Sequence, residues 1–464
     1  MQKWGKRCLL RQPMIWNSIW ERINIIFLWL LCVANRNKLC RMKAIMIFLA
    51  VLLFPVASLL GQSEIQKYAG TAMPYPSIKE LPILNHEGMV PFYINHLGRH
   101  GARFPTSGKA LDKAKEALIL GQQENRLTTD GKILLSTLQH LSDSFEGQWG
   151  KLSVLGELEQ KGIAGRMMRH YPQLFSNSAK VEAIATYVPR CINSMDAFLT
   201  RLMQDNPSLR IQRNEGRQYD DILRFFDLNK SYVNYKNNGD WLSIYKAFVR
   251  NKISSASIMK KFFIEPERET DEEAEEVVMA LFSIASILPD TGLLTNLDDL
   301  FTMEEWRSYW QTQNLRQYMS KSSAPVGRML PVAISWPLLS DFIYTTDEVI
   351  KGKSDNAANF HFAHAETVIP FVALMGIENT DVQISNPDSV SRYWKDYEIS
   401  PMAANVQWIF YHDKARGVWV KILLNEKEAK LPIATSRFPY YPWETVCAYF
   451  KERIEMAKRI LVKN

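Results

Sequence analysis

Short apolar runs that alternate with helical segments constrain the fold of this chain most strongly. The runs MVPFYIN (89–95) and VEAIATYV (181–188) have the length and the turn-forming flanks of buried strands. Each run leads into a segment whose apolar residues have helical spacing, over about 108–148 and 193–203, and another such segment covers about 156–172. This strand–loop–helix order predicts an α/β fold with a mostly parallel sheet flanked by helices.

The middle of the chain has a different pattern. From about 217 to 345 it has many helical windows and almost no strand signal, which predicts an inserted helical domain. A strand pattern returns at NFHFA (359–363) and is followed by the helical segment TVIPFVALM. The runs at 405–413 and 417–425 alternate around the turn DKAR and predict a β-hairpin. An amphipathic helix over about 443–461 is the last predicted element.

The positive charge of the chain lies at its N-terminus. The formal net charge is +7, and residues 1–41 contain eight Lys and Arg residues against the single acid Glu21. The rest of the chain is therefore neutral, which argues against a general surface for nucleic acid or another polyanion.

An apolar segment follows this basic leader. Met42 and Lys43 precede AIMIFLAVLLFPVASLLG, a charged start and an apolar run that ends in small residues, as in a secretory signal peptide. A membrane anchor is the alternative, but the run is short for a span of ~20 residues and Pro55 interrupts it. We therefore predict a periplasmic or secreted protein that is not bound to a membrane after cleavage, and we interpret residues 1–41 as a spurious upstream extension.

These patterns divide the chain into five predicted parts. They are the upstream extension (1–41), the signal peptide (42–61), the first part of an α/β core domain (62–215), the inserted helical domain (216–345) and the second part of the core (346–464). Beyond the leader, Cys191 and Cys447 are the only cysteines, and one disulfide between them is permitted in an oxidising compartment.

The octet GRHGARFP (98–105) places two arginines and a histidine directly behind the first predicted strand. The carboxyl edge of a parallel sheet binds ligands, and a helix N-terminus beside it favours anions. Arg99 and Arg103 offer planar forks of donors that match phosphate oxygens. Like-charge repulsion should keep His100 neutral and nucleophilic near physiological pH. A structural ion-pair network is the alternative interpretation of this octet.

A second polar cluster follows a later predicted strand, in NFHFAHAET (359–367). His364 and Glu366 come where a loop would open onto the same sheet edge. Cleavage of a phosphate ester through a phosphohistidine needs a nucleophile, cations around the phosphoryl oxygens and an acid for the departing alkoxide. A metal site of the form HxxHxE is the alternative, but His361 and His364 differ by an odd number of strand positions and tend to point to opposite faces. We therefore expect no metal and no cofactor.

Both motifs resemble those of a known family. GRHGARFPT is similar to the RHGxRxP signature of the histidine acid phosphatases, and HAET resembles the HAE form of the multiple inositol polyphosphate phosphatase branch. IATYVPRCINSMDAFL resembles the family segment whose strand ends in a phosphate-binding arginine. The resemblance implies the histidine phosphatase fold, with His100 as the nucleophile and Glu366 as the proton donor and later the base for water. It also implies that four residues hold the phosphoryl group, namely Arg99, Arg103, Arg190 and His364.

The resemblance further implies a phosphomonoesterase whose substrates are inositol polyphosphates, phytate included, and the signal-peptide pattern predicts that it is exported. A broad-specificity acid or sugar phosphatase would share every catalytic residue, and a non-catalytic phosphate-binding protein would share the pocket but should lack His100 or Glu366. A substrate with many phosphates requires further cations. The predicted helical domain offers Arg224, Lys230, Lys236 and Lys246.

Overall fold

The computed structural model describes residues 64–76, 88–268 and 270–463. The predicted upstream extension (1–41) and signal peptide (42–61) therefore lie outside the described residues. From Ile65 onward the chain forms one compact unit. Within the described ranges, no helix has both the length and the apolar character needed to cross a membrane.

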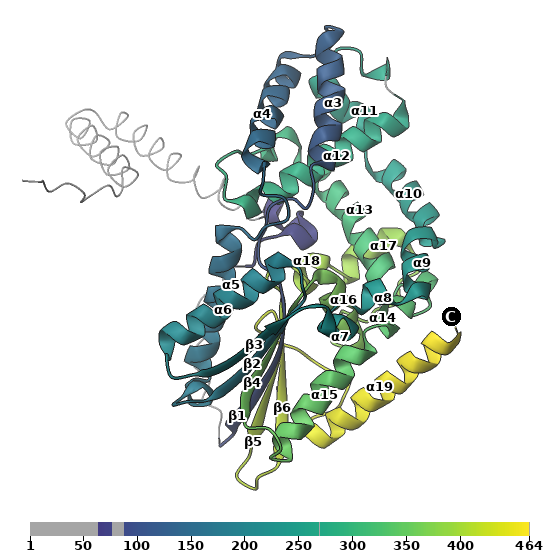
Figure 1. Cartoon of the computed structure of the whole chain (residues 1–464). Coiled ribbons are helices and arrows are strands. Elements are labelled where there is room, and N and C mark those ends of the chain that lie inside the picture. The colour runs from purple at the N-terminus through teal and green to yellow at the C-terminus, as the bar shows by residue number, and fades with distance from the viewer. Residues whose placement is uncertain (1–63, 77–87, 269, 464) are drawn as a thin grey trace, which may run out of the picture. The chain divides into compact units, whose positions relative to one another are not determined.

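A mixed eight-stranded sheet lies at the centre of this unit, with β3-β2-β4-β1-β5-β6-β7 in spatial order and β8 paired with β6 (Figure 1). Strands β3, β2, β4 and β1 run parallel, whereas β5 and β6 form the predicted antiparallel hairpin beside β1. The strand bounds are β1 Val90–Arg99, β2 Lys180–Ala185, β3 Arg210–Glu215, β4 Asn356–Ala363, β5 Asn405–His412, β6 Val418–Leu424, β7 Lys427–Glu428 and β8 Tyr440–Pro442.

Strand β3 was not predicted from the sequence. Its sequence RIQRNE contains a single apolar residue, Ile211, and three of its six residues are exposed because β3 is an edge strand. Neither an alternating nor a continuous apolar pattern marks such a strand, so the sequence gives no signal for it.

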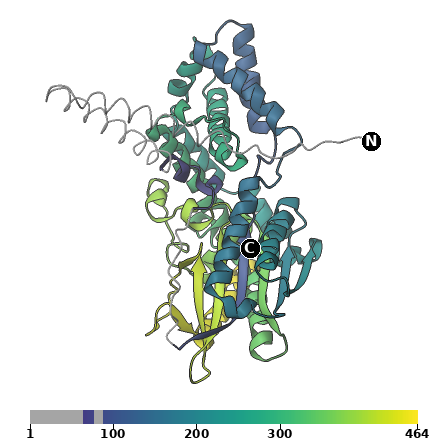
Figure 2. The same cartoon turned by 90° about the vertical axis from the view of Figure 1, so that its left-hand side faces the viewer.

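Helices cover both faces of the sheet (Figures 1 and 2). On one face, α5 and α6 pack on the sheet through contacts such as Phe198 against Phe360, whose ring centroids are 4.9 Å apart. On the other face, the rings of Trp408 and Phe450 also lie 4.9 Å apart. The covering helices are α5 Val154–His170, α6 Pro189–Asp205, α15 Trp336–Ile350, α16 Ala365–Met375 and α19 Trp443–Lys463. This arrangement confirms the predicted fold class.

The segment between β3 and β4 is helical, as predicted. Its longest helices, α12 and α13, begin at capping boxes in which Thr270 pairs with Glu273 and Thr302 with Glu305. The helices before α15 are α7 Asp220–Leu223, α8 Phe225–Leu228, α9 Lys230–Asn238, α10 Trp241–Lys252, α11 Ser255–Phe262, α12 Asp271–Thr291, α13 Met303–Lys321 and α14 Leu330–Ala333. Two short helices, α17 Pro387–Tyr393 and α18 Asp396–Ile399, precede β5.

Two helices from the first part of the chain join these inserted helices. α3 (Lys109–Gln123) and α4 (Thr129–Phe145) share one apolar core with α11 and α12, which includes Leu118 and Leu281. The limits of the inserted domain at 216 and 345 stay a prediction.

The backbone of the loop behind β1 approaches the backbone at the start of α5 closely. A Cβ atom at Gly101 would lie 2.4 Å from the carbonyl oxygen of Gly156, and one at Gly156 would lie 2.2 Å from that of Ala102. We expect Gly156→Ala to lower the free energy of unfolding by about 1–3 kcal/mol, because backbone atoms cannot move aside as a side chain can. Urea denaturation measures this change.

Gly162, on the same helix, provides the matched control. Its added Cβ would meet the end of the Arg166 side chain, at 3.1 Å from Nη1, and not a backbone atom. Gly162→Ala should therefore be neutral or stabilising, by up to about 1 kcal/mol. Equal losses in both variants would show that the close approach at Gly156 does not matter.

Candidate active site

Three neighbouring parallel strands, β2, β4 and β1, end side by side at one edge of the sheet. In the β1–β4 pair, Arg99 lies opposite Ala363. The residues that follow these strands therefore meet. The amide of His100 donates to the carbonyl oxygen of Ala363 at 3.0 Å, and the rings of His100 and His364 have centroids 5.8 Å apart. Arg190, in the first turn of α6, reaches the same place, with Nη2 at 3.5 Å from Nδ1 of His364.

The imidazole of His100 is oriented by its own loop. Its Nδ1 lies 3.0 Å from the carbonyl oxygen of Gly101, which can only accept, so Nδ1 carries the hydrogen and Nε2 keeps its lone pair. Burial, followed by the charges of Arg99, Arg190 and Arg103, lowers the pKa of His100 well below its usual value. The ring is therefore a neutral base with its free nitrogen at Nε2.

The three predicted arginines bring unpaired donors to this point. Arg99 is anchored because its Nη1 donates to the carbonyl oxygens of Thr71 and Ser400, at 2.6 and 2.7 Å. The buried Nε atoms of Arg99, Arg103 and Arg190 form no hydrogen bond with the described residues. Burial and the other two arginines lower the pKa of Arg103 to about 10, which shows the mutual repulsion that an anion would relieve.

A buried carboxyl group, Asp290 of α12, acts electrostatically on these arginines. Neither of its oxygens has a hydrogen-bond partner among the described residues. Burial and the neighbouring Glu159 raise the pKa of Asp290 well above its usual value, against the opposing effect of Arg103 and Arg99. A protonated Asp290 leaves the positive charge of the arginines available to a ligand.

His364 lies between two guanidinium groups at the N-terminus of α16. Its Nε2 accepts from Nη1 of Arg224 at 2.9 Å, which fixes Nε2 as the unprotonated nitrogen. Burial, then Arg190, lowers the pKa of His364 to about 3, although Glu366 opposes this shift. Arg224 was predicted from the sequence only as one of four further cations for substrate binding, whereas the structure places it in contact with His364.

Glu366, in the first turn of α16, forms an ion pair that the sequence did not predict. Nζ of Lys321, at the end of α13, lies 2.8 Å from its Oε1, and the two side chains are 12% and 33% exposed. Burial alone would raise the pKa of Glu366, but Lys321 and His364 outweigh it and hold this pKa well below its usual value. No motif surrounds Lys321 in the sequence, so its contact with Glu366 could not be predicted and arises from the fold alone.

Polar residues from α5 and α6 support the loop that carries His100. Glu159 accepts from the amides of Ala102 and Tyr75 at 2.7 and 2.6 Å, and Oγ of Ser194 accepts from the amide of Gly101 at 3.1 Å. Burial raises the pKa of Glu159 to about 7, although both amide hydrogen bonds oppose the shift. In the sequence these residues resemble ordinary polar positions of amphipathic helices.

His361 does not join the site. Its Nε2 contacts Asp341 of α15 at 3.1 Å, and its Nδ1 lies 3.0 Å from the carbonyl oxygen of His96. Within the part of the chain that the structure describes, no group of three His, Cys, Asp or Glu side chains is arranged to hold a metal ion. That the site works without metal or cofactor stays a prediction.

Both cysteines outside the leader are buried free thiols. Sγ of Cys191 lies 3.6 Å from Nε2 of His364, and Cys447 belongs to α19. The disulfide that the sequence permitted is not formed.

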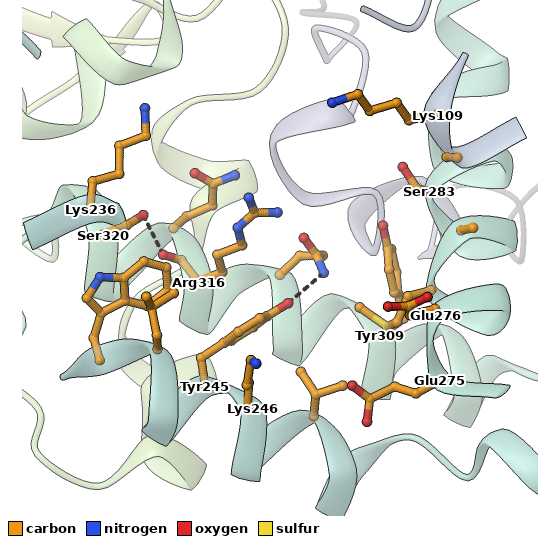
Figure 3. Close-up of a pocket in the computed structure, with 18 of the residues that line it drawn as sticks. Lys109, Lys236, Tyr245, Lys246, Glu275, Glu276, Ser283, Tyr309, Arg316 and Ser320 are labelled. Carbon is orange, nitrogen blue, oxygen red and sulfur yellow. Dashed lines mark hydrogen bonds between the residues drawn. The ribbon is translucent and has the colours of Figure 1, made fainter. Parts of the chain in front are cut away.

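A cavity of about 1260 Å³ adjoins Glu366 and Lys321 and is lined by residues of α3, α9, α10, α12 and α13 (Figure 3). Lys236, Lys246 and Arg316, from α9, α10 and α13, bring positive charge to the cavity, and Figure 3 shows Glu275 and Glu276 of α12 together on one side of it. Two of the four cations predicted for substrate binding, Lys236 and Lys246, therefore line this cavity. Lys230 is not among the lining residues.

The described geometry agrees with the results of sequence comparison. A family model for the histidine phosphatase superfamily (branch 2) matches residues 93–425, a span that contains both motifs. The chain belongs to branch 2 of the histidine phosphatase superfamily. This histidine phosphatase is 23% identical over 436 residues to multiple inositol polyphosphate phosphatase 1 of Homo sapiens, a match that covers 85% of this chain and 88% of the human one.

Solved structures show the same fold. Two crystal structures of Bifidobacterium longum multiple inositol polyphosphate phosphatase, in complex with inositol hexasulfate and with phosphate, match this histidine phosphatase with TM-scores of 0.72 and 0.73. Sequence identity is 18% in both, and the matches cover 83% and 84% of this chain and 97% and 98% of theirs. The predicted family and fold are thus confirmed, and with them the class of enzyme, a phosphoric monoester hydrolase.

Proposed function

We propose that this chain is an exported phosphatase that hydrolyses inositol polyphosphates, phytate included, through a covalent phosphohistidine. The observation that carries the proposal is the neutral His100, which lies among arginines whose charge no described carboxylate pairs with. Export, to the periplasm or out of the cell, rests on the signal-peptide pattern at 42–61.

In the first step, Nε2 of His100 attacks phosphorus, and the bond between phosphorus and the ester oxygen breaks as the P–N bond forms. Arg99, Arg103, Arg190 and His364 hold the phosphoryl oxygens and stabilise the charge that they carry. The carboxyl group of Glu366 gives its proton to the departing alkoxide, which is otherwise a very poor leaving group.

In the second step, water attacks the phosphohistidine. The Glu366 carboxylate takes a proton from the water as the new P–O bond forms and the P–N bond breaks. Inorganic phosphate and neutral His100 result, so the cycle consumes one water and needs no other reactant.

The substrate class is supported by the cavity and by the relatives. Lys236, Lys246 and Arg316 line the cavity and form no ion pair with a described carboxylate, so they are free to meet further phosphates of a large anionic substrate. The human relative is named for inositol polyphosphates, and the Bifidobacterium structure holds inositol hexasulfate.

Initial rates on three substrates test the proposal. Phytate should give a higher kcat/KM than glucose 1-phosphate or p-nitrophenyl phosphate, because it alone has phosphates for the cavity cations. Equal kcat/KM values on all three would favour a broad-specificity acid or sugar phosphatase. Phosphate binding with no turnover of any of them would favour a non-catalytic binding protein.

A further inference from the structure

The ion pair between Lys321 and Glu366 joins the helical part of the molecule to the catalytic edge of the sheet. Lys321 is the last residue of α13, and Glu366 is the second residue of α16. The Lys321 side chain is only 12% exposed, so its ammonium group meets Glu366 largely out of water. Both residues also line the cavity. An ion pair of this kind is sensitive to its surroundings, because little solvent screens it.

Several other charged or titratable groups also act on this pair. Arg99 and His364 act on Glu366 from the sheet edge, and Arg316 on α13 acts on Lys321. The remaining ones are Arg103, from the loop behind β1, Tyr232, from α9, and Asp396, from α18. Lys321 is the only described cation in direct ion-pair contact with Glu366.

We propose that Lys321 is a positioning residue that sets the protonation state of Glu366 and thereby the pH range in which this group can act as the acid. The proposal rests on the proposed function, in which Glu366 donates the proton. Lys321 itself need not touch the reacting atoms. Its ammonium group holds the carboxyl group in place at the cavity wall and favours the ionised form, which the second step requires as a base.

The direction of the effect follows from the opposing forces on Glu366. Burial raises the pKa of Glu366, and the charge of Lys321 is the largest of the effects that lower it. Removal of that charge therefore raises this pKa, and the protonated acid persists to higher pH. A substrate that needs the acid should then be cleaved at a pH where the wild-type enzyme no longer cleaves it well.

A ratio of two rates isolates this effect. The value of kcat/KM for β-glycerophosphate, a poor leaving group, is divided by that for p-nitrophenyl phosphate, whose nitrophenolate leaves without a proton. The scan runs from about pH 2 to pH 8, because the pKa of Glu366 lies well below its usual value. In the wild type the ratio should fall as Glu366 ionises. In Lys321→Met the fall in the ratio should move to higher pH. At pH values above the wild-type fall, the ratio of the variant should exceed that of the wild type about tenfold. This factor corresponds to a pKa change of about one, the lower end of the change that an opposite charge ~4–6 Å away causes in a carboxyl group.

Two variants serve as controls. Lys321→Arg keeps the charge and should keep the wild-type profile, whereas Glu366→Gln should give a low ratio that does not change with pH. Lys321→Gln, which retains a hydrogen-bond donor without charge, repeats the test, and thermal melting with and without phosphate reports whether each variant folds.

The outcomes separate the two proposals. A wild-type ratio that depends on pH, together with a flat ratio in Glu366→Gln, would support Glu366 as the acid. If folded Lys321→Met and Lys321→Gln then both followed the wild-type profile, the role of Lys321 would be contradicted and the proposed function would stand. If Glu366→Gln leaves the ratio unchanged, the assignment of the acid fails, and the role of Lys321 fails with it.

Discussion

Replacement of His100 by alanine should reduce turnover of every phosphate ester to less than ~1% of the wild-type rate. The proposed reaction forms a P–N bond at Nε2 of this residue, whereas the unprotonated Nε2 of His364 already accepts a hydrogen bond from Arg224. The loss should appear in kcat for aryl and alkyl phosphates alike, because both need the nucleophile. Steady-state rates on phytate and p-nitrophenyl phosphate measure it.

Phosphate binding should survive in His100→Ala. Arg99 keeps its anchors on Thr71 and Ser400, and the guanidinium groups of Arg103 and Arg190 do not depend on the imidazole. Titration calorimetry with inorganic phosphate checks this and shows that the variant is folded. His140→Ala, at an exposed position of α4, is the matched control and should behave as the wild type. Activity of His100→Ala well above ~1% would contradict a nucleophilic role.

Replacement of Glu366 by glutamine should separate substrates by their leaving groups. The amide cannot give a proton to an alkoxide, so the rate on β-glycerophosphate should fall by roughly 10²-fold or more. A nitrophenolate leaves without a proton, and the burst of nitrophenolate that reports the first step should keep its rate. Stopped-flow measurement of that burst, beside steady-state rates on the alkyl ester, tests the difference.

Glu157→Gln is the control for this variant. Glu157 also lies in the first turn of a helix, α5, and is paired with a lysine, Lys161, but its side chain is exposed. Its replacement should change neither rate. If Glu366→Gln slowed both substrates equally, Glu366 would be needed for structure or binding and would not be the acid.

The sequence predicted the catalytic edge well because its chemistry lies in two local segments. His100 and His364 each follow an apolar strand, and the parallel pairing of β1 with β4 brings the two segments together as the strand–helix order implied. Arg190 lies behind β2, but it was predicted only from the family resemblance of its segment. Position relative to a strand end was sufficient to single out the segments of His100 and His364, whereas Arg190 needed the resemblance.

Residues that act from other elements were not found. Lys321 ends a helix of the inserted region, and Glu159 lies in the middle of α5, so neither has a local signal of function. Their roles depend on how helices pack against the sheet, which periodicity cannot specify. The sequence offered four cations for substrate binding, and only the structure separates Lys236 and Lys246, at the cavity, from Arg224, at His364.

The proposed mechanism requires that His100 carries the phosphoryl group during turnover. The most direct test mixes the enzyme with ³²P-labelled substrate, quenches the reaction within milliseconds in base, and maps the label by proteolysis. We predict an acid-labile, base-stable phosphate on the peptide that contains His100, and no label in His100→Ala. A label on another peptide, or turnover with no labelled intermediate at any time, would contradict the claim.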